Sequence, residues 1–508
     1  MKKITGKKFL LIMIIPSLIL IDILICVGLY FFEPIYFNSP DLTLSDYSFD
    51  LYKKYNDTSS DFYIKQISAD DIVSASIDPR LKYVDDTIII TYSNNATIDD
   101  IYKILSPYNA SICGYIKDIN LIQAEFKNHD YPDLVNICSE LEEYDLIYNA
   151  IVDYFEETPS SETTTTQTEE LHNNYYYSLI NYPSDLTDYD NDTSSVNVGI
   201  FDVLVDSENN YLNIVNKNTY DVNSLNNTLI SAFNNHGTHV AGILCASSES
   251  DAPAICPDAQ IISDNAMNNS ISYWVAAITD MIVNYDAKVI NMSIGYNSFL
   301  TLSATAGCNN TIEYINSESD IFADVLSKLI DDGHEFVICT AAGNDSGSSV
   351  NKIFNGYFGY GEKKLLDKFD IFNIFTKKIK YCDSKYSLPL SAITDDKVRS
   401  RIIVVGSCDW YKSISDYSSL SDRVDIIAPG EHIYSLNFDS ENAYDYMSGT
   451  SMATPFVSGT AALLFAENPD ITGNAVKHVL ISSADEEISN DSFTYPLLNV
   501  TQALEMVK

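Results

Sequence analysis

The chain has 508 residues, and its 71 acidic against 30 basic side chains give a formal net charge of −41. Such a surface repels the phosphate backbone of nucleic acids, so we exclude a nucleic-acid partner. The length allows two or three domains with a large core. Nine cysteines are too few and too scattered for a disulfide scaffold, and the sequence leaves open whether Cys245 and Cys256 pair.

Residues 1–32 have the pattern of a membrane anchor. Lysines within the first eight residues precede an apolar run from Phe9 to Phe32, which is long enough to span a bilayer. Insertion of Asp22 near the bilayer centre costs about 3 kcal/mol. Each Leu, Ile, Phe or Val favours insertion by roughly 0.3–0.6 kcal/mol, and these side chains are numerous enough to outweigh that cost. The lysines favour a cytoplasmic N-terminus with the rest of the chain outside. Because no small-residue cleavage site follows, we predict a retained anchor; the alternative is a removed signal and a secreted protein.

Residues 33–82 are polar with little periodicity, and we predict a spacer there. Residues 83–155 show six elements in the order β-α-β-β-α-β, which is the ferredoxin-like α+β arrangement. A variant capping box of Thr97 and Asp100 opens the first helix, and Pro132 opens the second. The strands are Thr87–Tyr92, Ser111–Ile116, Leu121–Phe126 and Tyr144–Val152. Residues 156–170 are rich in Glu, Ser and Thr, which predicts an exposed linker.

An acid and two histidines follow the linker. Val196–Phe201 is a largely apolar strand that ends at Asp202, and α/β enzymes place their sites at the carboxyl ends of strands. Asp206 is an alternative acid, although it lies past the strand end. His236 and His239 share a predicted helix over 236–247, one turn apart, and compete for the role of a base.

A serine lies at the start of another predicted helix, within Met447–Ala462. Pro455 cannot donate a backbone hydrogen bond, so we place it in the first turn, which puts Ser451 beside the free N–H groups of the helix start. A hydroxyl there can attack a carbonyl while those donors hold the oxyanion. It needs a base, and the base needs a third group that orients it.

Two further apolar strands, Lys288–Gly295 and Phe336–Gly343, lie between the histidines and the serine. The second leads into Asn344. A stretch of about residues 348–400 is predicted to be an insertion, with many lysines and with apolar residues near helical spacing. Such a stretch either packs on its own domain or lies on an anionic membrane surface.

The chain order acid, histidine, serine, together with the motifs around His236 and Ser451, resembles the subtilisin-like serine proteases, or subtilases; this order is the one known from subtilisin. The resemblance covers about Tyr175 to the C-terminus. It implies an α/β domain over 171–508, with a largely parallel sheet and helices on both faces. It also implies a serine endopeptidase that acts on peptides or proteins. The usual Thr-Gly after the acid is replaced by Val203-Leu204, which changes the turn but not the chemistry.

The resemblance also implies roles for individual residues. Asp202 would orient His236, which would act as the base for the nucleophile Ser451, and Asn344 would donate to the oxyanion. Ser293, Ile294 and Gly295 would line the substrate and pair with its backbone.

Residues 83–155 would be the family's pro-domain, a folding helper and inhibitor that is cut off in the linker; a separate binding module is the alternative. The chemistry would require no cofactor. Structural calcium is common in the family, but no spacing here identifies its ligands. Two other functions stay open: a catalytically silent peptide-binding module, which a complete triad argues against, and a serine esterase. No Gly-X-Ser-X-Gly elbow surrounds Ser451.

Overall fold

The structure is a computed structural model that describes most of the chain from residue 54 onward. The described ranges are 54–76, 81–156, 175–184, 186, 193–203, 205–216, 236–252, 254–266, 269–296, 298–305, 307–346, 381–437 and 444–508. The predicted anchor (1–32), nearly all of the predicted linker (157–170) and residues 347–380 of the predicted insertion lie outside them. No helix in the described ranges is both long and apolar enough to cross a membrane.

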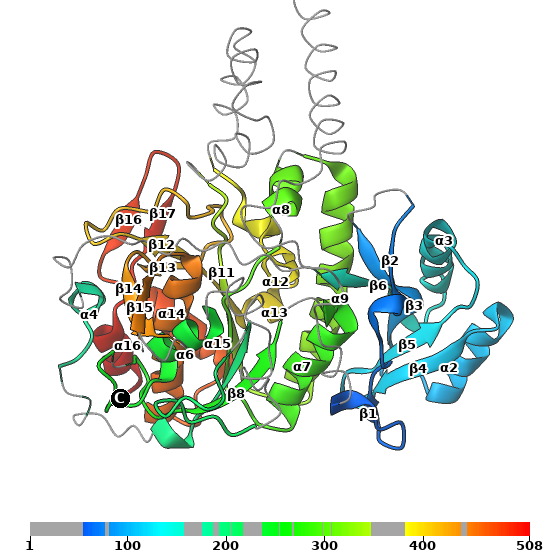
Figure 1. The fold of residues 1–508 in the computed structure, drawn as a ribbon, viewed down its shortest axis with the longest axis horizontal. Coiled ribbons are helices and arrows are strands. Elements are labelled where there is room, and N and C mark those ends of the chain that lie inside the picture. Colours follow the sequence, from blue (N-terminus) through cyan, green and yellow to red (C-terminus); the bar gives the residue numbers. More distant parts are fainter. Residues whose placement is uncertain are drawn as a thin grey trace, which may run out of the picture.

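The described residues form two packed units that lie side by side (Figure 1). The smaller, N-terminal unit comprises residues 54–156, and the larger unit begins at residue 175. Helices α7 (Ile271–Val283) and α9 (Asn309–Asp331) of the larger unit lie between its sheet and the N-terminal unit. These two helices therefore carry most of the surface on which the two units meet.

The N-terminal unit is built on an antiparallel sheet with the order β1-β4-β5-β3-β6-β9, in which β2 also pairs with β3. The predicted β-α-β-β-α-β order is confirmed. The Thr97–Asp100 capping box also forms as predicted. The elements of this unit are β1 (Phe62–Tyr63), β2 (Ile72–Ser74), β3 (Lys82–Tyr92), α2 (Ile98–Leu105), β4 (Ser111–Ile116), β5 (Leu121–Glu125), α3 (Tyr131–Leu141) and β6 (Ile147–Glu156). Strand β9 (Asn269–Ser270), which pairs with β6, belongs to the larger unit.

The prediction of a spacer over 33–82 is wrong for the described residues 54–76. This segment contributes β1 and β2 to the sheet, and Tyr55, Ile64 and Ile67 are buried. The two strands are only two and three residues long, too short to produce a period-2 pattern in the sequence.

The larger unit is built on a six-stranded parallel sheet with the order β13-β12-β11-β10-β7-β8, which confirms the predicted sheet. Helices α6, α14 and α15 lie on one face, and α7 and α9 lie on the other (Figure 1). A sheet covered on both faces explains why its strands are almost continuously apolar. The bounds are β7 (Asn197–Asp202), α6 (His236–Cys245), β8 (Gln260–Asn265), β10 (Val289–Met292), β11 (Val337–Ala341), β12 (Ile402–Cys408), β13 (Ile426–Pro429), α14 (Thr450–Glu467) and α15 (Gly473–Ser482).

The remaining elements cover the ends and edges of this sheet. Two antiparallel hairpins, β14–β15 and β16–β17, accompany five shorter helices. They are α4 (Tyr175–Leu179), α8 (Ser298–Thr305), α12 (Pro389–Ala392), α13 (Asp396–Arg399), β14 (Ile433–Leu436), β15 (Tyr444–Met447), β16 (Glu487–Ser489), β17 (Thr494–Pro496) and α16 (Val500–Val507).

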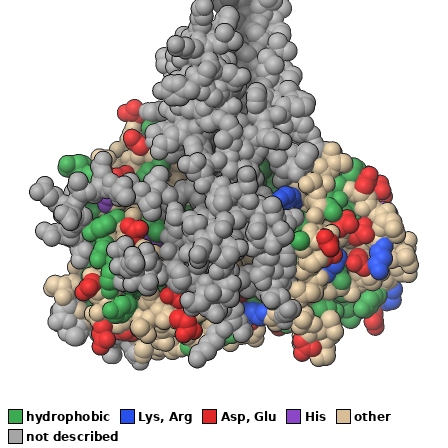
Figure 2. Space-filling model, viewed as in Figure 1, with side chains coloured by type: hydrophobic (Ala, Val, Ile, Leu, Met, Phe, Trp, Pro, Cys, Tyr) green, Lys and Arg blue, Asp and Glu red, His purple; other side chains and the backbone are tan. Residues whose placement is uncertain are grey.

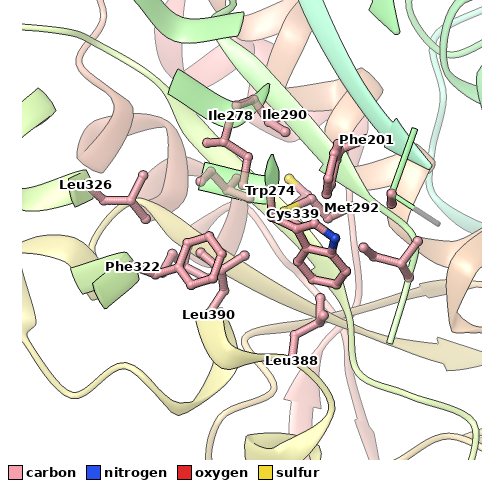
Figure 3. Packing of buried hydrophobic residues seen from close by; sticks show 14 of the residues in the cluster. Phe201, Trp274, Ile278, Ile290, Met292, Phe322, Leu326, Cys339, Leu388 and Leu390 are labelled. Carbon is pink, nitrogen blue, oxygen red and sulfur yellow. The ribbon is translucent and has the colours of Figure 1, made fainter. Parts of the chain in front are cut away.

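The core between the sheet and α7 is centred on Trp274, whose ring lies edge-on to Phe201 at 5.5 Å between centroids. Met292 from β10 lines the same space (Figure 3). Cys339 is fully buried, in the manner of a small core residue. The eight described cysteines, Cys245 and Cys256 included, are free thiols.

The surface reflects the acidic composition. Figure 2 shows Asp and Glu side chains over both units on the visible face, and Lys and Arg side chains on and beside the N-terminal unit.

Candidate active site

Asp202 and His236 form a close, buried pair at the carboxyl end of β7. Asp202 is the last residue of β7, and His236 is the first residue of α6. Asp202 Oδ1 lies 2.6 Å from His236 Nδ1, and the two residues are only 1% and 7% exposed. The same oxygen accepts the backbone N–H of Val203 at 2.6 Å. A carboxylate at Nδ1 holds the proton on that nitrogen, so Nε2 is left as the basic atom of the ring.

A glycine allows α6 to approach β7 closely enough for this contact. Gly237 donates its N–H to the carbonyl of Val203 at 2.8 Å. A Cβ atom at position 237 would lie 2.1 Å from that carbonyl oxygen. Any other residue would therefore force the start of α6, and His236 with it, away from Asp202.

The two alternative residues have other partners. His239 is fully buried, and its Nε2 lies 3.1 Å from the carbonyl of Ile433 and 3.2 Å from that of Asp445. Burial lowers the pKa of His239 to about 3, so its ring stays neutral and joins the two strands of the β14–β15 hairpin. Asp206 accepts the backbone N–H of Glu208 at 3.0 Å. The structure thus pairs His236 with Asp202.

Ser451 is the second residue of α14 and is 6% exposed. The prediction that Pro455 lies in the first turn is wrong, because α14 begins at Thr450 and Pro455 falls inside the helix. Pro455 has no N–H to donate to the residue four positions earlier, which is Ser451. Ser293 Oγ takes that place and donates to the carbonyl of Ser451 at 2.8 Å.

Ser293 belongs to a buried polar chain that links β10 to α14. Asn291 Nδ2 donates to Ser293 Oγ at 2.9 Å, and Ser458 Oγ donates to Asn291 Oδ1 at 2.8 Å. The sequence analysis missed this chain; the signal was a pair of polar residues, Asn291 and Ser458, inside otherwise apolar runs. The Ser293 side chain therefore fixes the helix that carries Ser451.

The other two predicted substrate-binding residues follow Ser293 along the chain. Ile294 is 7% exposed, and Gly295 is partly exposed. After them the chain contacts Ser387, whose carbonyl accepts the N–H of Tyr296 at 2.7 Å. The structure thus keeps Ser293, Ile294 and Gly295 together beyond the carboxyl end of β10.

Asn344 follows β11 and is bonded to the residue that precedes Ser451. Its Oδ1 accepts both the N–H and the Oγ–H of Thr450, each at 2.9 Å. Because a backbone N–H can only donate, the side-chain oxygen must face Thr450, so the NH₂ group of Asn344 is the part that can donate elsewhere. The left-handed turn at Gly343 (φ +97°) leads into Asn344, and the N–H of Gly343 donates to Thr450 Oγ1 at 3.2 Å. The sequence analysis did not identify this role of Thr450.

These contacts bring an acid, an imidazole and an amide to one edge of the parallel sheet. Helix α14, which carries Ser451, packs against both α6 and the strands β10 and β11. The arrangement combines an imidazole paired with a carboxylate, a serine at a helix start and an amide bonded to the residue before that serine. In the described part of the chain, no group of three or more His, Cys, Asp or Glu residues could hold a metal ion.

Comparisons with known proteins agree with this arrangement. The model of the subtilase family, peptidase S8, matches residues 133–496. Subtilisin DY from Bacillus licheniformis is 27% identical over 320 residues, which cover 61% of this chain and 92% of that protein. The thermophilic serine proteinase from Bacillus sp. strain AK1 is 23% identical over 391 residues, 76% of this chain and 79% of that protein. The chain therefore belongs to the subtilase family of serine endopeptidases.

Two solved structures share the fold at low sequence identity. Fervidolysin from Fervidobacterium pennivorans has a TM-score of 0.58 at 17% identity, and the match covers 85% of this chain and 63% of that chain. The epidermin leader peptide processing serine protease from Staphylococcus aureus has a TM-score of 0.51 at 18% identity. That match covers 83% of this chain and 98% of that chain, so the shared fold extends beyond the larger unit.

Proposed function

We propose that Asp202, His236 and Ser451 form a catalytic triad that hydrolyses peptide bonds by acyl transfer. The observation that carries the proposal is the buried 2.6 Å contact between Asp202 Oδ1 and His236 Nδ1, which directs the basic Nε2 away from the acid. The start of α14, which packs against α6, supplies the serine. Asp206 and His239 are not needed.

In the proposed mechanism, His236 Nε2 takes the proton of Ser451 Oγ as that oxygen attacks the scissile carbonyl. His236 then gives the proton to the leaving amine, and the acyl group remains on Ser451. Water attacks the acyl group in the second half of the reaction, again with His236 as the base. Asp202 holds the imidazole and stabilises its charge, while the Asn344 amide and the backbone N–H of Ser451 stabilise the oxyanion. No cofactor takes part.

We propose that Ser293, Ile294 and Gly295 bind the substrate through their backbone, as an added strand beside β10. The Ser293 side chain is bonded to the Ser451 carbonyl, so its part in substrate binding is limited to its backbone groups. The substrate class is peptides or proteins.

We further propose that the N-terminal unit is a pro-domain that the enzyme cuts from itself. Strand β6 pairs with β9 of the larger unit, with Phe155 opposite Ser270 and Glu156 opposite Asn269. Asp153 accepts the N–H and Oγ–H of Ser272 at 3.1 and 2.7 Å, so the end of β6 is held against the start of α7. Strand β6 therefore ends against the larger unit at Glu156. In the proposed processing, the residues that follow would meet Ser451 at a high effective concentration, which makes the cut intramolecular.

For residues 9–32 we propose a membrane anchor that places the two units outside the cell. The proposal rests on the length of the apolar run and the lysines before it. Protease shaving of intact cells should remove the larger unit. Protection from shaving would reverse the proposed topology.

Mass spectrometry of the purified full chain tests the proposed self-processing. The wild type should appear as two fragments with a cut between Asp153 and Ile180, at a rate independent of enzyme concentration, and Ser451→Ala should stay a single chain. An intact wild type with full peptidase activity would show that the N-terminal unit is a permanent module. A comparison of peptide with ester hydrolysis separates a peptidase from an esterase, and inactivity on both would indicate a silent binding module.

A further inference from the structure

Two residues at the start of the described chain contact the larger unit at a place separate from β6. Lys54 Nζ lies 3.0 Å from Asp264 Oδ2 and 2.8 Å from Asp280 Oδ2. Tyr55 OH donates to the same two oxygens, at 3.1 and 3.3 Å. Asp264 is on β8 and Asp280 is on α7, so one lysine and one tyrosine join a strand and a helix of the larger unit. We name Lys54 and Tyr55 the N-terminal clamp.

The clamp and its two carboxylates are buried. Tyr55 is 4% exposed, the Asp264 and Asp280 side chains are 5% and 9% exposed, and the Lys54 side chain is 15% exposed. The outer oxygens of the two carboxylates are also satisfied, because Tyr273 OH donates to Asp264 Oδ1 at 2.5 Å and Asn284 Nδ2 donates to Asp280 Oδ1 at 2.6 Å. Two carboxylates on one buried surface thus depend on one ammonium group, and its removal leaves uncompensated buried charge.

The clamp is an integral part of the N-terminal unit. The N–H of Ile64 donates to the carbonyl of Tyr55 at 2.8 Å, and the rings of Tyr55 and Phe62 lie 5.7 Å apart. Phe62 belongs to β1, which pairs with β4 of the sheet. The Tyr55 ring also meets Tyr273 of α7 edge-on at 5.7 Å. The family match begins only at residue 133, so the clamp lies outside the part of the chain that it describes.

We propose that the N-terminal clamp is a second attachment point that keeps the N-terminal unit bound to the larger unit after the linker has been cut. The proposal rests on the proposed self-processing for its biological role. While both the clamp and β6 are bound to the larger unit, each contact keeps the other close to its binding partner. If one contact opens, it therefore re-forms at a high effective concentration. Cleavage alone then does not separate the two units, and release of the N-terminal unit requires that the clamp also detaches.

The test uses the full chain with Ser451→Ala and a recognition sequence for an added site-specific protease between residues 157 and 170. After the cut, the dissociation rate of the two fragments is measured on dilution. Lys54→Met keeps the aliphatic stem but removes the charge, and we expect it to raise the rate by about 10²-fold, within the usual range for loss of one of two linked sites. Tyr55→Phe keeps the ring and should raise the rate by a smaller factor.

Two variants serve as matched controls. Lys54→Arg keeps the charge and should release the fragment much more slowly than Lys54→Met. Lys117→Met removes another lysine of the N-terminal unit, whose partner Asp61 lies in the same unit at 2.8 Å with both side chains exposed, and should leave the rate unchanged. Equal dissociation rates for Lys54→Met, Tyr55→Phe and Lys117→Met would overturn the proposal. Immediate dissociation of the cut N-terminal unit in the protein with Lys54 and Tyr55 unchanged would also overturn it.

The added protease makes the cut, so the clamp is tested even if the enzyme does not process itself. With Ser451 present, Lys54→Met should also shorten the delay between self-cleavage and full peptidase activity. Absence of self-cleavage in that background would contradict the proposed function and leave the clamp measurement standing. Should Lys54→Met prevent folding, Tyr55→Phe decides alone, because it removes only a hydroxyl group.

Discussion

The active-site edge and the surface between the two units both depend on buried polar groups, but they satisfy them differently. At the active site, Asp202 bonds within the larger unit to His236 and to a backbone N–H, and Asn344 bonds to Thr450. Between the units, one oxygen of each of the carboxylates Asp264 and Asp280 is satisfied by side chains of the other unit. The hydrogen bonds of the active site should therefore survive removal of the N-terminal unit, whereas Asp264 and Asp280 lose the partners that this unit provides. Catalysis and release can then be altered separately.

The largest effect should come from the triad. Ser451→Ala or His236→Ala should lower kcat/KM for a peptide by about 10⁶-fold, the scale known for the subtilisin triad. Asp202→Ala should cost less, because Asp202 orients the imidazole and does not react. All three variants should leave the dissociation rate of the cut N-terminal unit unchanged, because none of these residues lies on the surface between the two units. A purified Ser451→Ala protein that still hydrolyses the peptide, free of contaminating protease, would contradict the mechanism.

A smaller loss should follow from Asn344→Ala. Removal of one oxyanion donor costs about 10²–10³-fold in kcat in subtilisin, and we expect a similar loss with little change in KM, because this contact forms in the transition state. Steady-state kinetics on a peptide substrate measures both constants. A change in KM alone would make Asn344 a binding or turn residue.

Ser293 gives the sharpest test of how the nucleophile is positioned. Ser293→Ala leaves the buried carbonyl of Ser451 without its donor, and we expect kcat to fall by about tenfold, since an unsatisfied buried group costs roughly 1–3 kcal/mol. The double variant Ser293→Ala/Pro455→Ala restores an N–H at position 455 that can reach the same carbonyl, and it should recover much of the loss. If kcat does not recover in the double variant although its thermal stability is unchanged, Ser293 does not act through the carbonyl of Ser451.

The contact between the units should weaken as the pH rises. Burial raises the pKa of Glu318 on α9 from 4.5 to about 8 and that of Asp153 on β6 from 3.8 to about 6. The bound form thus holds protons more tightly than the separated form, so this stabilisation is complete below the ordinary pKa values and is lost as the pH rises through about 6 and about 8. The cut N-terminal unit should dissociate faster at about pH 9 than at about pH 5.

A substitution on α9 isolates this effect. Glu318→Gln mimics the protonated side chain, which contacts Tyr296 and Glu156, and it should remove the upper part of the pH dependence. Glu313→Gln on the same helix is exposed and should leave the profile unchanged. A profile that Glu318→Gln does not alter would assign the pH dependence to other groups.

Local patterns in the sequence predicted the β-α-β-β-α-β unit, and the resemblance to the subtilases predicted the parallel sheet and the Asp202–His236 pair. They predicted neither the bond from Asn344 to Thr450 nor the one from Ser293 to Ser451, whose partners are 106 and 158 positions apart. The clamp joins residues 210 positions apart. A single sequence shows that Lys54 is charged and Asn344 polar, but periodicity and capping rules act within one element and do not indicate which distant group each will meet. The short strands β1 and β2 were not predicted for a related reason. They are recognised as strands by their pairing with β4 and β3, and their own sequences show no strand pattern.

In the proposed mechanism, Ser451 is a nucleophile activated by His236 and Asp202. Treatment of the folded full chain with a fluorophosphonate, with the adduct located by mass spectrometry, tests this role most directly. We expect one adduct, on Ser451, that is lost in His236→Ala and slowed in Asp202→Ala. An unlabelled wild type, or an adduct on a different serine, would contradict it.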